Sequence, residues 1–321
     1  MATVADFLKE WDAPVEFIEA HTSGSTGTPK SIRLPKADMR LSARATIRFF
    51  GITAASTLAL PLSVDYIAGK MMAVRARMAG CRLLELPVSG RIVLTEDVDL
   101  LAVVPSQVEF LIESGSISHV RNLLVGGAPL TPAQYAMIEG CGVRAFIGYG
   151  MTETCSHVAL RRIGGGDSDS LYTAMPGITF DTDSRGCLVI LSDGFSWRRL
   201  VTNDVVRLHG NTAFEWLGRA DNVINSGGIK IHPEQEEAVM RAHIPGLPPF
   251  YLVGEPDGQW GSRLVMVAEA RPGSLDLNRI KGALPDKRKA PRSIFYVDRL
   301  PVTVSGRKLR RLAPADISRT C

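Results

Sequence analysis

The chain has few of the features that mark secreted, zinc-binding or membrane proteins. Its five cysteines form an odd set without C-x-x-C spacing, which suits reduced thiols and argues against zinc. No stretch gives eighteen unbroken apolar residues, and the amino-terminal residues lack a basic region followed by an apolar run. We therefore expect a soluble, cytoplasmic protein.

Strong net charge is also missing. The formal charge of +4 and the pI near 8.8 do not by themselves indicate nucleic acid or membrane binding. The excess lies near the carboxyl end, where twelve Lys/Arg stand against three Asp/Glu between Arg279 and Arg319. We interpret most of these as a solvated basic surface and expect a few to contact phosphates. The 321 residues, 45% of them apolar, fit one large and one small domain.

Residues 21–31, HTSGSTGTPKS, combine glycine, small hydroxyl residues and one lysine. Such a loop gathers backbone and side-chain donors, and Lys30 adds a cation, so phosphate is the expected ligand; a flexible linker is the alternative. Pro29 stands where a P-loop needs glycine, and the G-x-S-x-G pattern of esterases is absent. The candidate phosphate-binding residues are Thr22, Ser23, Gly24, Ser25, Thr26, Gly27 and Lys30.

Apolar runs alternate with helical patterns in the first two-thirds of the chain. We predict strands at 100–105, 121–127 and 143–150, with helices at 107–113 and 131–140 between them. This order predicts a mainly parallel α/β sheet, whose ligands lie beyond the carboxyl ends of its strands. The residues expected there are Gly126, Gly127, Ala128 and the segment from Tyr149 through Gly150 to Glu153.

Shorter elements follow the glycine run at 164–166. We predict strands at 187–192, 214–218, 250–254, 263–269 and 294–298 and a helix near 233–242. A turn-rich stretch begins at 218, and we place a domain boundary at Asp221. The expected architecture is a large α/β domain over 1–220 and a small α+β domain over 221–321.

Four segments, taken together, resemble the acyl-adenylate-forming superfamily of AMP-binding enzymes and acyl-CoA synthetases. They are TSGSTGTPK (22–30), GYGMTET (148–154), TND (202–204) and GRADNVINSGGIKI (218–231), in that family's order. The resemblance implies two steps with ATP, Mg²⁺ and coenzyme A. A carboxylate attacks the α-phosphorus of ATP to give acyl-AMP and pyrophosphate, and a thiol then displaces AMP.

The resemblance also implies roles for individual residues. Glu153 would bind Mg²⁺ and Thr152 the α-phosphate, although a helix-start glutamate is an alternative. Asp204 would accept hydrogen bonds from the ribose, or be a turn aspartate, and Arg219 would reach the sugar or phosphate. Tyr149 and the Gly126–Ala128 turn would form a slot for adenine.

The small domain is expected to be mobile. Asp221 matches the family's hinge, and Gly227 and Gly228 match a loop that approaches the thiol, so they should matter for thioester formation and spare adenylation. The family's catalytic lysine follows a glycine directly, whereas here Arg307 follows the glycine and Lys308 comes next. We favour Lys308 as the catalytic cation, with Arg307 as second choice; two solvated basic residues are the alternative.

Only twenty residues precede His21, fewer than most family members have before the phosphate loop. We therefore expect a large domain truncated at its start. Its acyl pocket would have fewer walls or borrow some from a second copy, and an exposed apolar flank would favour a homodimer.

The segment 60–80, LPLSVDYIAGKMMAVRARMAG, resembles a compact subset of o-succinylbenzoate-CoA ligases of menaquinone biosynthesis. In that subset an arginine five residues before the A-G glycine binds the substrate's second carboxylate, which corresponds to Arg75. Lys70 and Arg77 share a helix face from which Arg75 is absent, and the alternative is that all three are solvated. The expected reaction converts o-succinylbenzoate, ATP and CoA to o-succinylbenzoyl-CoA. The alternatives are an adenylation enzyme that loads a carrier protein and a non-catalytic nucleotide-binding subunit.

Overall fold

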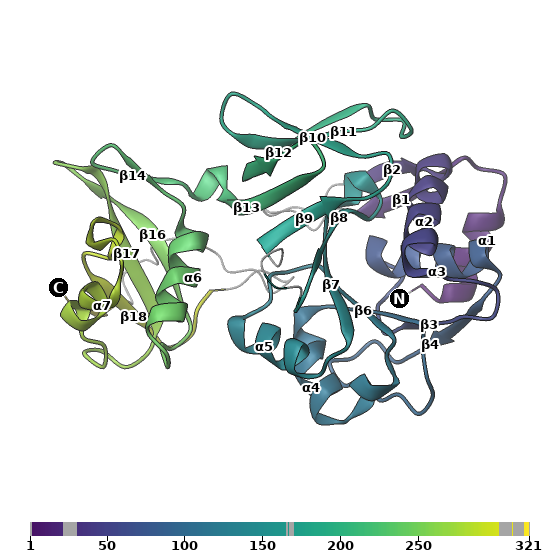
Figure 1. Cartoon of the computed structure of the whole chain (residues 1–321), viewed down its shortest axis with the longest axis horizontal. Helices are drawn as coiled ribbons and strands as arrows, with labels where there is room; N and C mark the ends of the chain where they lie inside the picture. The colour runs from purple at the N-terminus through teal and green to yellow at the C-terminus, as the bar shows by residue number, and fades with distance from the viewer. Residues whose placement is uncertain are drawn as a thin grey trace. The chain divides into compact units, whose positions relative to one another are not determined.

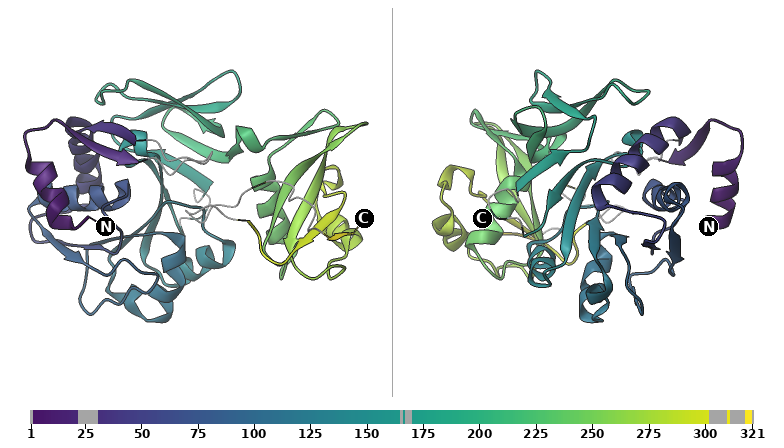
Figure 2. Two further views of the ribbon diagram at one scale, coloured as in Figure 1. Left: turned by 180° about the vertical axis from the view of Figure 1, so that it is seen from behind. Right: turned by 45° about the vertical axis from the view of Figure 1, so that its right-hand side comes forward.

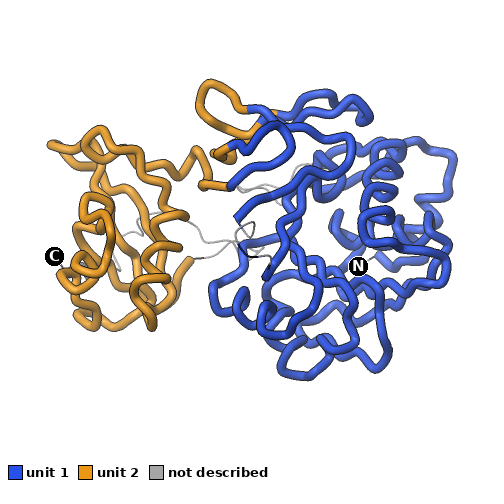
Figure 3. Tube along the Cα trace, viewed as in Figure 1, with its two compact units in different colours: residues 1–181, 189–200, 208–215 blue, residues 182–188, 201–207, 216–321 orange. Residues whose placement is uncertain are grey.

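The structure is a computed structural model that describes residues 2–21, 31–164, 166, 170–301 and 310, and the backbone of 318–320. It divides into two compact units, drawn in blue and orange in Figure 3. Unit 1 comprises 1–181, 189–200 and 208–215, and unit 2 comprises 182–188, 201–207 and 216–321. The division at 215/216 lies close to the expected boundary at Asp221, whose role as a hinge stays a prediction.

Five parallel strands form the centre of unit 1 (Figure 1). In spatial order they are β7 (Arg144–Gly150), β6 (Asn122–Val125), β5 (Leu100–Val103), β3 (Thr57–Leu60) and β4 (Arg82–Glu85). The inner strands β6, β5 and β3 consist almost entirely of Leu, Val and Ala and are buried, as is typical of strands covered on both faces. The prediction of a mainly parallel α/β sheet is confirmed.

Helices cover both faces of this sheet. Those of unit 1 are α1 (Val4–Asp12), α2 (Lys36–Phe50), α3 (Ile67–Ala79), α4 (Val108–Glu113) and α5 (Pro132–Gly140). The predicted cap of α5 is present, because the Thr131 hydroxyl accepts from the Gln134 amide and Pro132 begins the helix. Short 3-10 turns lie at η1 (Pro105–Gln107), η2 (Ser116–His119) and η3 (Thr152–Thr154).

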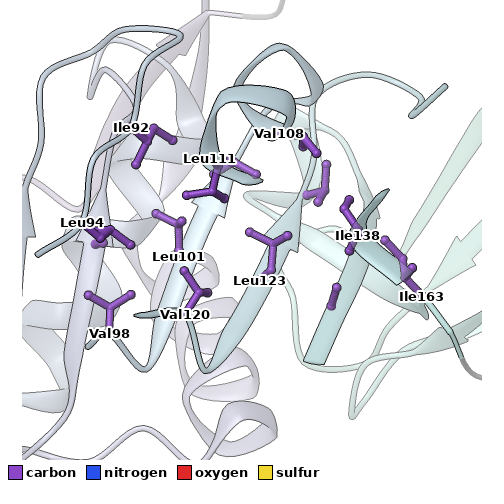
Figure 4. Close-up of a cluster of buried hydrophobic side chains, with 14 of the residues drawn as sticks. Ile92, Leu94, Val98, Leu101, Val108, Leu111, Val120, Leu123, Ile138 and Ile163 are labelled. Atoms are coloured by element: carbon purple, nitrogen blue, oxygen red, sulfur yellow. The ribbon is translucent and has the colours of Figure 1, made fainter. Parts of the chain in front are cut away.

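Strand β7 shows how the two faces are filled. Phe146 contacts the rings of Phe49 and Phe50 in α2, with centroids 5.2 and 5.6 Å apart. Its neighbours Ala145 and Ile147 belong instead to the apolar cluster under α4 and α5 that Figure 4 shows. Since successive strand side chains point to opposite faces, α2 covers one face and α4 and α5 the other.

Antiparallel strands extend the sheet beyond β7. They are β8 (His157–Arg162), β9 (Leu171–Ala174), β13 (Ala213–Arg219), β12 (Arg199–His209), β11 (Cys187–Leu191) and β10 (Thr179–Thr182), in an eleven-stranded order. A separate antiparallel pair consists of β1 (Phe17–His21) and β2 (Ser31–Pro35). The predicted phosphate-binding loop, residues 22–30, joins β1 to β2 and lies outside the described residues.

Unit 2 contains a second sheet, visible from two further sides in Figure 2. Its strands are β14 (Ile224–Ser226), β15 (Ile229–Ile231), β16 (Phe250–Asp257), β17 (Gly261–Glu269), β18 (Ile294–Val297) and β19 (Ser318–Thr320). Its helices are α6 (Pro233–His243) and α7 (Leu277–Ala283), with 3-10 turns η5 (Ala220–Asn222) and η6 (Lys287–Lys289). The predicted helix near 233–242 and strands at 250–254, 263–269 and 294–298 are confirmed.

The start of α3 fits closely against the chain before it. A Cβ atom on Gly69 would lie 2.2 Å from the carbonyl oxygen of Ser63, so only glycine allows this approach. The contact fixes the helix that contains Arg75. Among the helices that the structure describes, none has the length and apolar character to cross a membrane.

Candidate active site

The GYGMTET segment folds into a tight reversal between β7 and β8. Cys155 has a φ of 63° and is the only described non-glycine residue with positive φ. A Cβ on Gly150 would lie 2.2 Å from the Ser156 carbonyl oxygen, so the two backbones touch. This close approach explains the glycine structurally, and a direct contact of Gly150 with a nucleotide stays a prediction.

Thr154 holds the reversal together. Its side chain is fully buried, and its hydroxyl accepts from the Met151 amide at 3.0 Å and faces the carbonyl oxygens of Met151 and Ser156 at 2.9 and 2.7 Å. Thr152 and Glu153 precede it on the same 3-10 turn. Their half-buried side chains form no hydrogen bond or ion pair with a described residue, and their contacts with a nucleotide or a metal stay predictions.

Four further predicted residues lie at the ends of β7 and β6. Tyr149 packs its ring edge-on against Phe214 and Tyr172, with centroids 5.0 and 5.7 Å apart. At the end of β6, Gly127 has a φ of 86°, and an added Cβ on Gly126 would meet no atom within 4 Å. The strand therefore ends in a turn that leaves space beside Gly126, and Ala128, the next predicted residue, is half-buried there. The adenine slot at these residues stays a prediction.

Arg75 is buried without a charged partner among the described residues. Only 2% of it is exposed. Its Nη2 donates to the Ser156 hydroxyl at 2.5 Å, its Nη1 to the Met72 sulfur at 3.5 Å, and its Nε to no described atom. Burial alone lowers the pKa of this guanidinium to about 9. A buried charge is costly unless it is paired, so an anionic ligand would relieve this one.

The other two cations of α3 face elsewhere. The Lys70 ammonium lies 4.6 Å from the centre of the Phe7 ring, and Arg77 pairs with Asp12 at 3.0 Å. Both partners belong to α1. The helix-face prediction is confirmed, because only Arg75 of the three reaches the turn after GYGMTET.

His157, which the sequence analysis did not select, lies beside Ser156. Its Nδ1 is 3.3 Å from the Ser156 hydroxyl, and its Nε2 is 3.2 Å from the Thr46 hydroxyl in α2. Burial, and then the charge of Arg75, hold the pKa of His157 well below its ordinary value. No motif spacing marks this histidine; only the reversal at Cys155 brings it to Arg75.

In unit 2, Arg219 contacts two predicted carboxylates. Its Nη1 is 3.5 Å from Asp204 and its Nη2 donates to Asp221 at 3.1 Å. Trp216 also donates to Asp204, at 3.2 Å. The structure thus gathers the predicted ribose-binding aspartate, its neighbouring arginine and the predicted hinge.

Gly227 and Gly228 form the two-residue turn of the β14–β15 hairpin. Their φ angles are 58° and 82°, which the primed turns of such hairpins require. A Cβ on Gly227 would lie 2.5 Å from the Trp260 indole, which is 46% exposed. The hairpin explains both glycines, and their part in thioester formation stays a prediction.

Arg310, like His157, was not selected by the sequence analysis. It forms two hydrogen bonds with the Glu237 carboxylate, donates to the Leu252 carbonyl at 3.0 Å and pairs with Glu234 at 3.3 Å. Glu237 is 4% exposed and also accepts from the Leu252 amide. Arg307 and Lys308, shortly before it in the chain, lie outside the described residues.

Comparison with known proteins identifies the family. The model of the AMP-binding enzyme family matches residues 19–180, just over half of the chain. An acyl-CoA synthetase (AMP-forming)/AMP-acid ligase II-like protein from Dyadobacter fermentans is 34% identical in sequence, with a TM-score of 0.65 over 96% of this chain and 91% of that one. The chain therefore belongs to the AMP-binding enzyme family, within its AMP-forming acid–CoA ligases.

Two curated relatives are 2-succinylbenzoate–CoA ligases. The one from Enterococcus faecalis is 26% identical over 89% of this chain and 67% of its own length, and the one from Listeria monocytogenes is 27% identical over 94% and 70%. The chain thus spans about two thirds of these relatives. The structure of O-succinylbenzoate coenzyme A synthetase from Bacillus subtilis, in complex with ATP and magnesium, shares the fold at a TM-score of 0.75 and 21% identity, over 91% of this chain and 68% of that one.

We expect a large local loss of stability when Arg310, which pairs with Glu234 and Glu237, is replaced. Arg310→Met should cost about 3 kcal/mol, because it removes two hydrogen bonds from the buried Glu237 carboxylate and leaves Arg241, at 3.9 Å, as its ion-pair partner. Arg288→Met is a matched control, since Arg288 pairs with Asp286 while 74% exposed and its loss should leave stability nearly unchanged. Amide hydrogen exchange over residues 233–257 measures both, and equal protection in the two variants would contradict the buried pairing.

His157 predicts a pH dependence of stability. The folded protein resists protonation of its imidazole, whereas the unfolded chain takes up the proton near pH 6.5. The unfolding free energy should therefore fall as the pH drops below about 6.5, by at most about 1.4 kcal/mol per pH unit from this group. Urea unfolding of wild type and His157→Gln between pH 5 and 8 should show a smaller fall in the variant; parallel curves would contradict the assignment.

Proposed function

We propose that this protein is an ATP-dependent acid–CoA ligase that converts 2-succinylbenzoate, ATP and CoA to 2-succinylbenzoyl-CoA, AMP and pyrophosphate. The observation that supports this substrate most directly is Arg75, buried beside the GYGMTET turn without a carboxylate among the described residues. An acid with a second carboxylate would supply the missing charge, whereas a fatty acid would leave the guanidinium unpaired. The names of the curated relatives favour the same acid.

In the first step the protein must offset the charge of the triphosphate while the acid approaches. We assign this to the donors of Thr22–Gly27 and to Lys30. The hydroxyl of Thr152 and the carboxylate of Glu153, which have no partner among the described residues, fit the α-phosphate and Mg²⁺, respectively. Bound Mg²⁺ supplies positive charge at the phosphate oxygens. The space at Gly126–Ala128 and the ring of Tyr149 would hold the adenine, and Asp204 with Arg219 the ribose.

In the second step a thiol must reach the acyl carbon. We assign the approach of CoA to the Gly227–Gly228 turn and the accompanying domain motion to Asp221. Lys308, or else Arg307, would provide the mobile cation of the adenylation step. A fork-shaped guanidinium and a compact ammonium are not equivalent there, so separate alanine variants distinguish them.

Acid-dependent exchange between pyrophosphate and ATP tests the proposal. Wild-type protein with Mg-ATP should show exchange with 2-succinylbenzoate well above that without acid, and free thioester should form when CoA is added. Exchange without free thioester, but with transfer to a carrier protein, would favour the carrier-loading alternative. No exchange above the blank would reject the enzyme.

Arg75→Met should raise the KM for 2-succinylbenzoate by about tenfold or more and leave the KM for ATP nearly unchanged. The expected size is that of a lost hydrogen bond to a charged group, about 1.5 to 3 kcal/mol. The fold should tolerate methionine, since replacing a buried charge by an apolar side chain of similar volume is often neutral. Arg77→Met on the same helix is the matched control and should change neither constant; equal rises in both KM values for Arg75→Met would reject the assignment.

A further inference from the structure

Four polar side chains from three elements, Arg75 among them, form a continuous series of hydrogen-bond contacts. Thr46 lies on α2, Arg75 on α3, and Ser156 and His157 at the start of β8. The successive contacts are Thr46 Oγ1 to His157 Nε2 at 3.2 Å, His157 Nδ1 to Ser156 Oγ at 3.3 Å, and Ser156 Oγ to Arg75 Nη2 at 2.5 Å. None of the predicted motif positions other than Arg75 takes part.

One assignment of donors and acceptors satisfies all the contacts among these four side chains. With the Thr46 hydroxyl donating to the Ser42 carbonyl at 3.2 Å, its oxygen accepts from His157, which assigns the proton of the neutral imidazole to Nε2. That leaves Nδ1 of the neutral imidazole as the acceptor for the Ser156 hydroxyl. The Ser156 hydroxyl then donates its single proton to Nδ1. Its oxygen accepts from Arg75, whose guanidinium can only donate.

His157 and Arg75 support each other across Ser156. A protonated His157 would donate from both nitrogens and lie close to the cation of Arg75, so the arginine favours the neutral ring. A neutral ring in turn keeps the Ser156 oxygen turned toward Nη2. Only one terminal nitrogen of Arg75 is held in this way, and Nε keeps no described partner. These contacts therefore orient the guanidinium and use only part of its hydrogen-bonding capacity.

We infer that Thr46, His157 and Ser156 are positioning residues that orient the Arg75 guanidinium toward the distal carboxylate of the acid. This inference rests on the proposed function for the identity of the acid. An arginine side chain that is not held has about 2 kcal/mol of rotamer entropy to lose on binding, so holding it in advance favours the diacid and adds nothing for ATP. We name these three residues and Arg75 the Arg75 relay.

A spectroscopic measurement tests the relay independently of any substrate. The ¹⁵N shifts of the His157 ring, assigned by comparison with His157→Asn, should show the neutral Nε2–H tautomer at pH 7. Ser156→Ala should shift the Nδ1 resonance, because it removes the donor to that nitrogen. An Nδ1–H tautomer in the wild-type protein would overturn the relay.

Kinetics then test the positioning. Ser156→Ala and His157→Leu should raise the KM for the diacid about tenfold, leave the KM for ATP unchanged, and leave the KM for an analogue with a neutral distal carboxamide unchanged. His157→Asn retains an acceptor near the position of Nδ1 and should recover most of the diacid affinity. A rise shared equally by diacid, carboxamide and ATP would indicate a purely structural role and reject the inference.

A double-mutant cycle separates this inference from the proposed function. Ser156→Ala should raise the diacid KM in the wild-type background and have no further effect in Arg75→Met, because Ser156 acts only through Arg75. The same added rise in both backgrounds would overturn the inference. If the wild-type protein supports no exchange with 2-succinylbenzoate, the proposed substrate fails, and the tautomer of His157 still decides whether the relay exists.

Discussion

The contact between the backbones of Gly150 and Ser156 is the constraint on which the candidate site depends. It requires a residue without Cβ at the end of β7 and a reversed backbone at Cys155 before β8 begins. Residues held at unfavourable φ and ψ cost on the order of 1 to 3 kcal/mol and persist only where the surroundings enforce them, as Thr154 does here. The same reversal follows the turn that carries Thr152 and Glu153 and sets Ser156 against Arg75.

Two buried arginines of this chain show opposite electrostatic arrangements. Arg310 is surrounded by Glu234, Glu237 and a backbone carbonyl, so its charge is balanced by described residues of its own unit. Arg75 has a hydroxyl, a thioether sulfur and no described carboxylate. The first arrangement is that of a structural pair, which is weak evidence for function. The second leaves an uncompensated charge, which is expected where a ligand completes the site.

Much of the fold could be predicted because its strands are short apolar runs separated by capped helices, as at Thr131. The position of Arg75 on α3 was also accessible, since helical periodicity separates it from Lys70 and Arg77. The relay was not accessible from the sequence. Thr46 and His157 are 111 residues apart, and a single hydroxyl or imidazole has no periodicity that points to its partner. Arg310 was hidden for a similar reason, because a run of basic residues is usually solvated and its buried partners lie on α6.

Cys155 follows the TET residues directly, which places a protein thiol next to the site where an acyl-AMP would form. In a ligase whose second step uses a thiol, such a neighbour would be a rival nucleophile able to trap the acyl group on the enzyme. Cys155 has no exposed surface, and burial, followed by the charge of Asp38, raises the pKa of its thiol to about 12. Because thiolates and not thiols are the reactive form, the turn keeps this thiol protonated and unreactive.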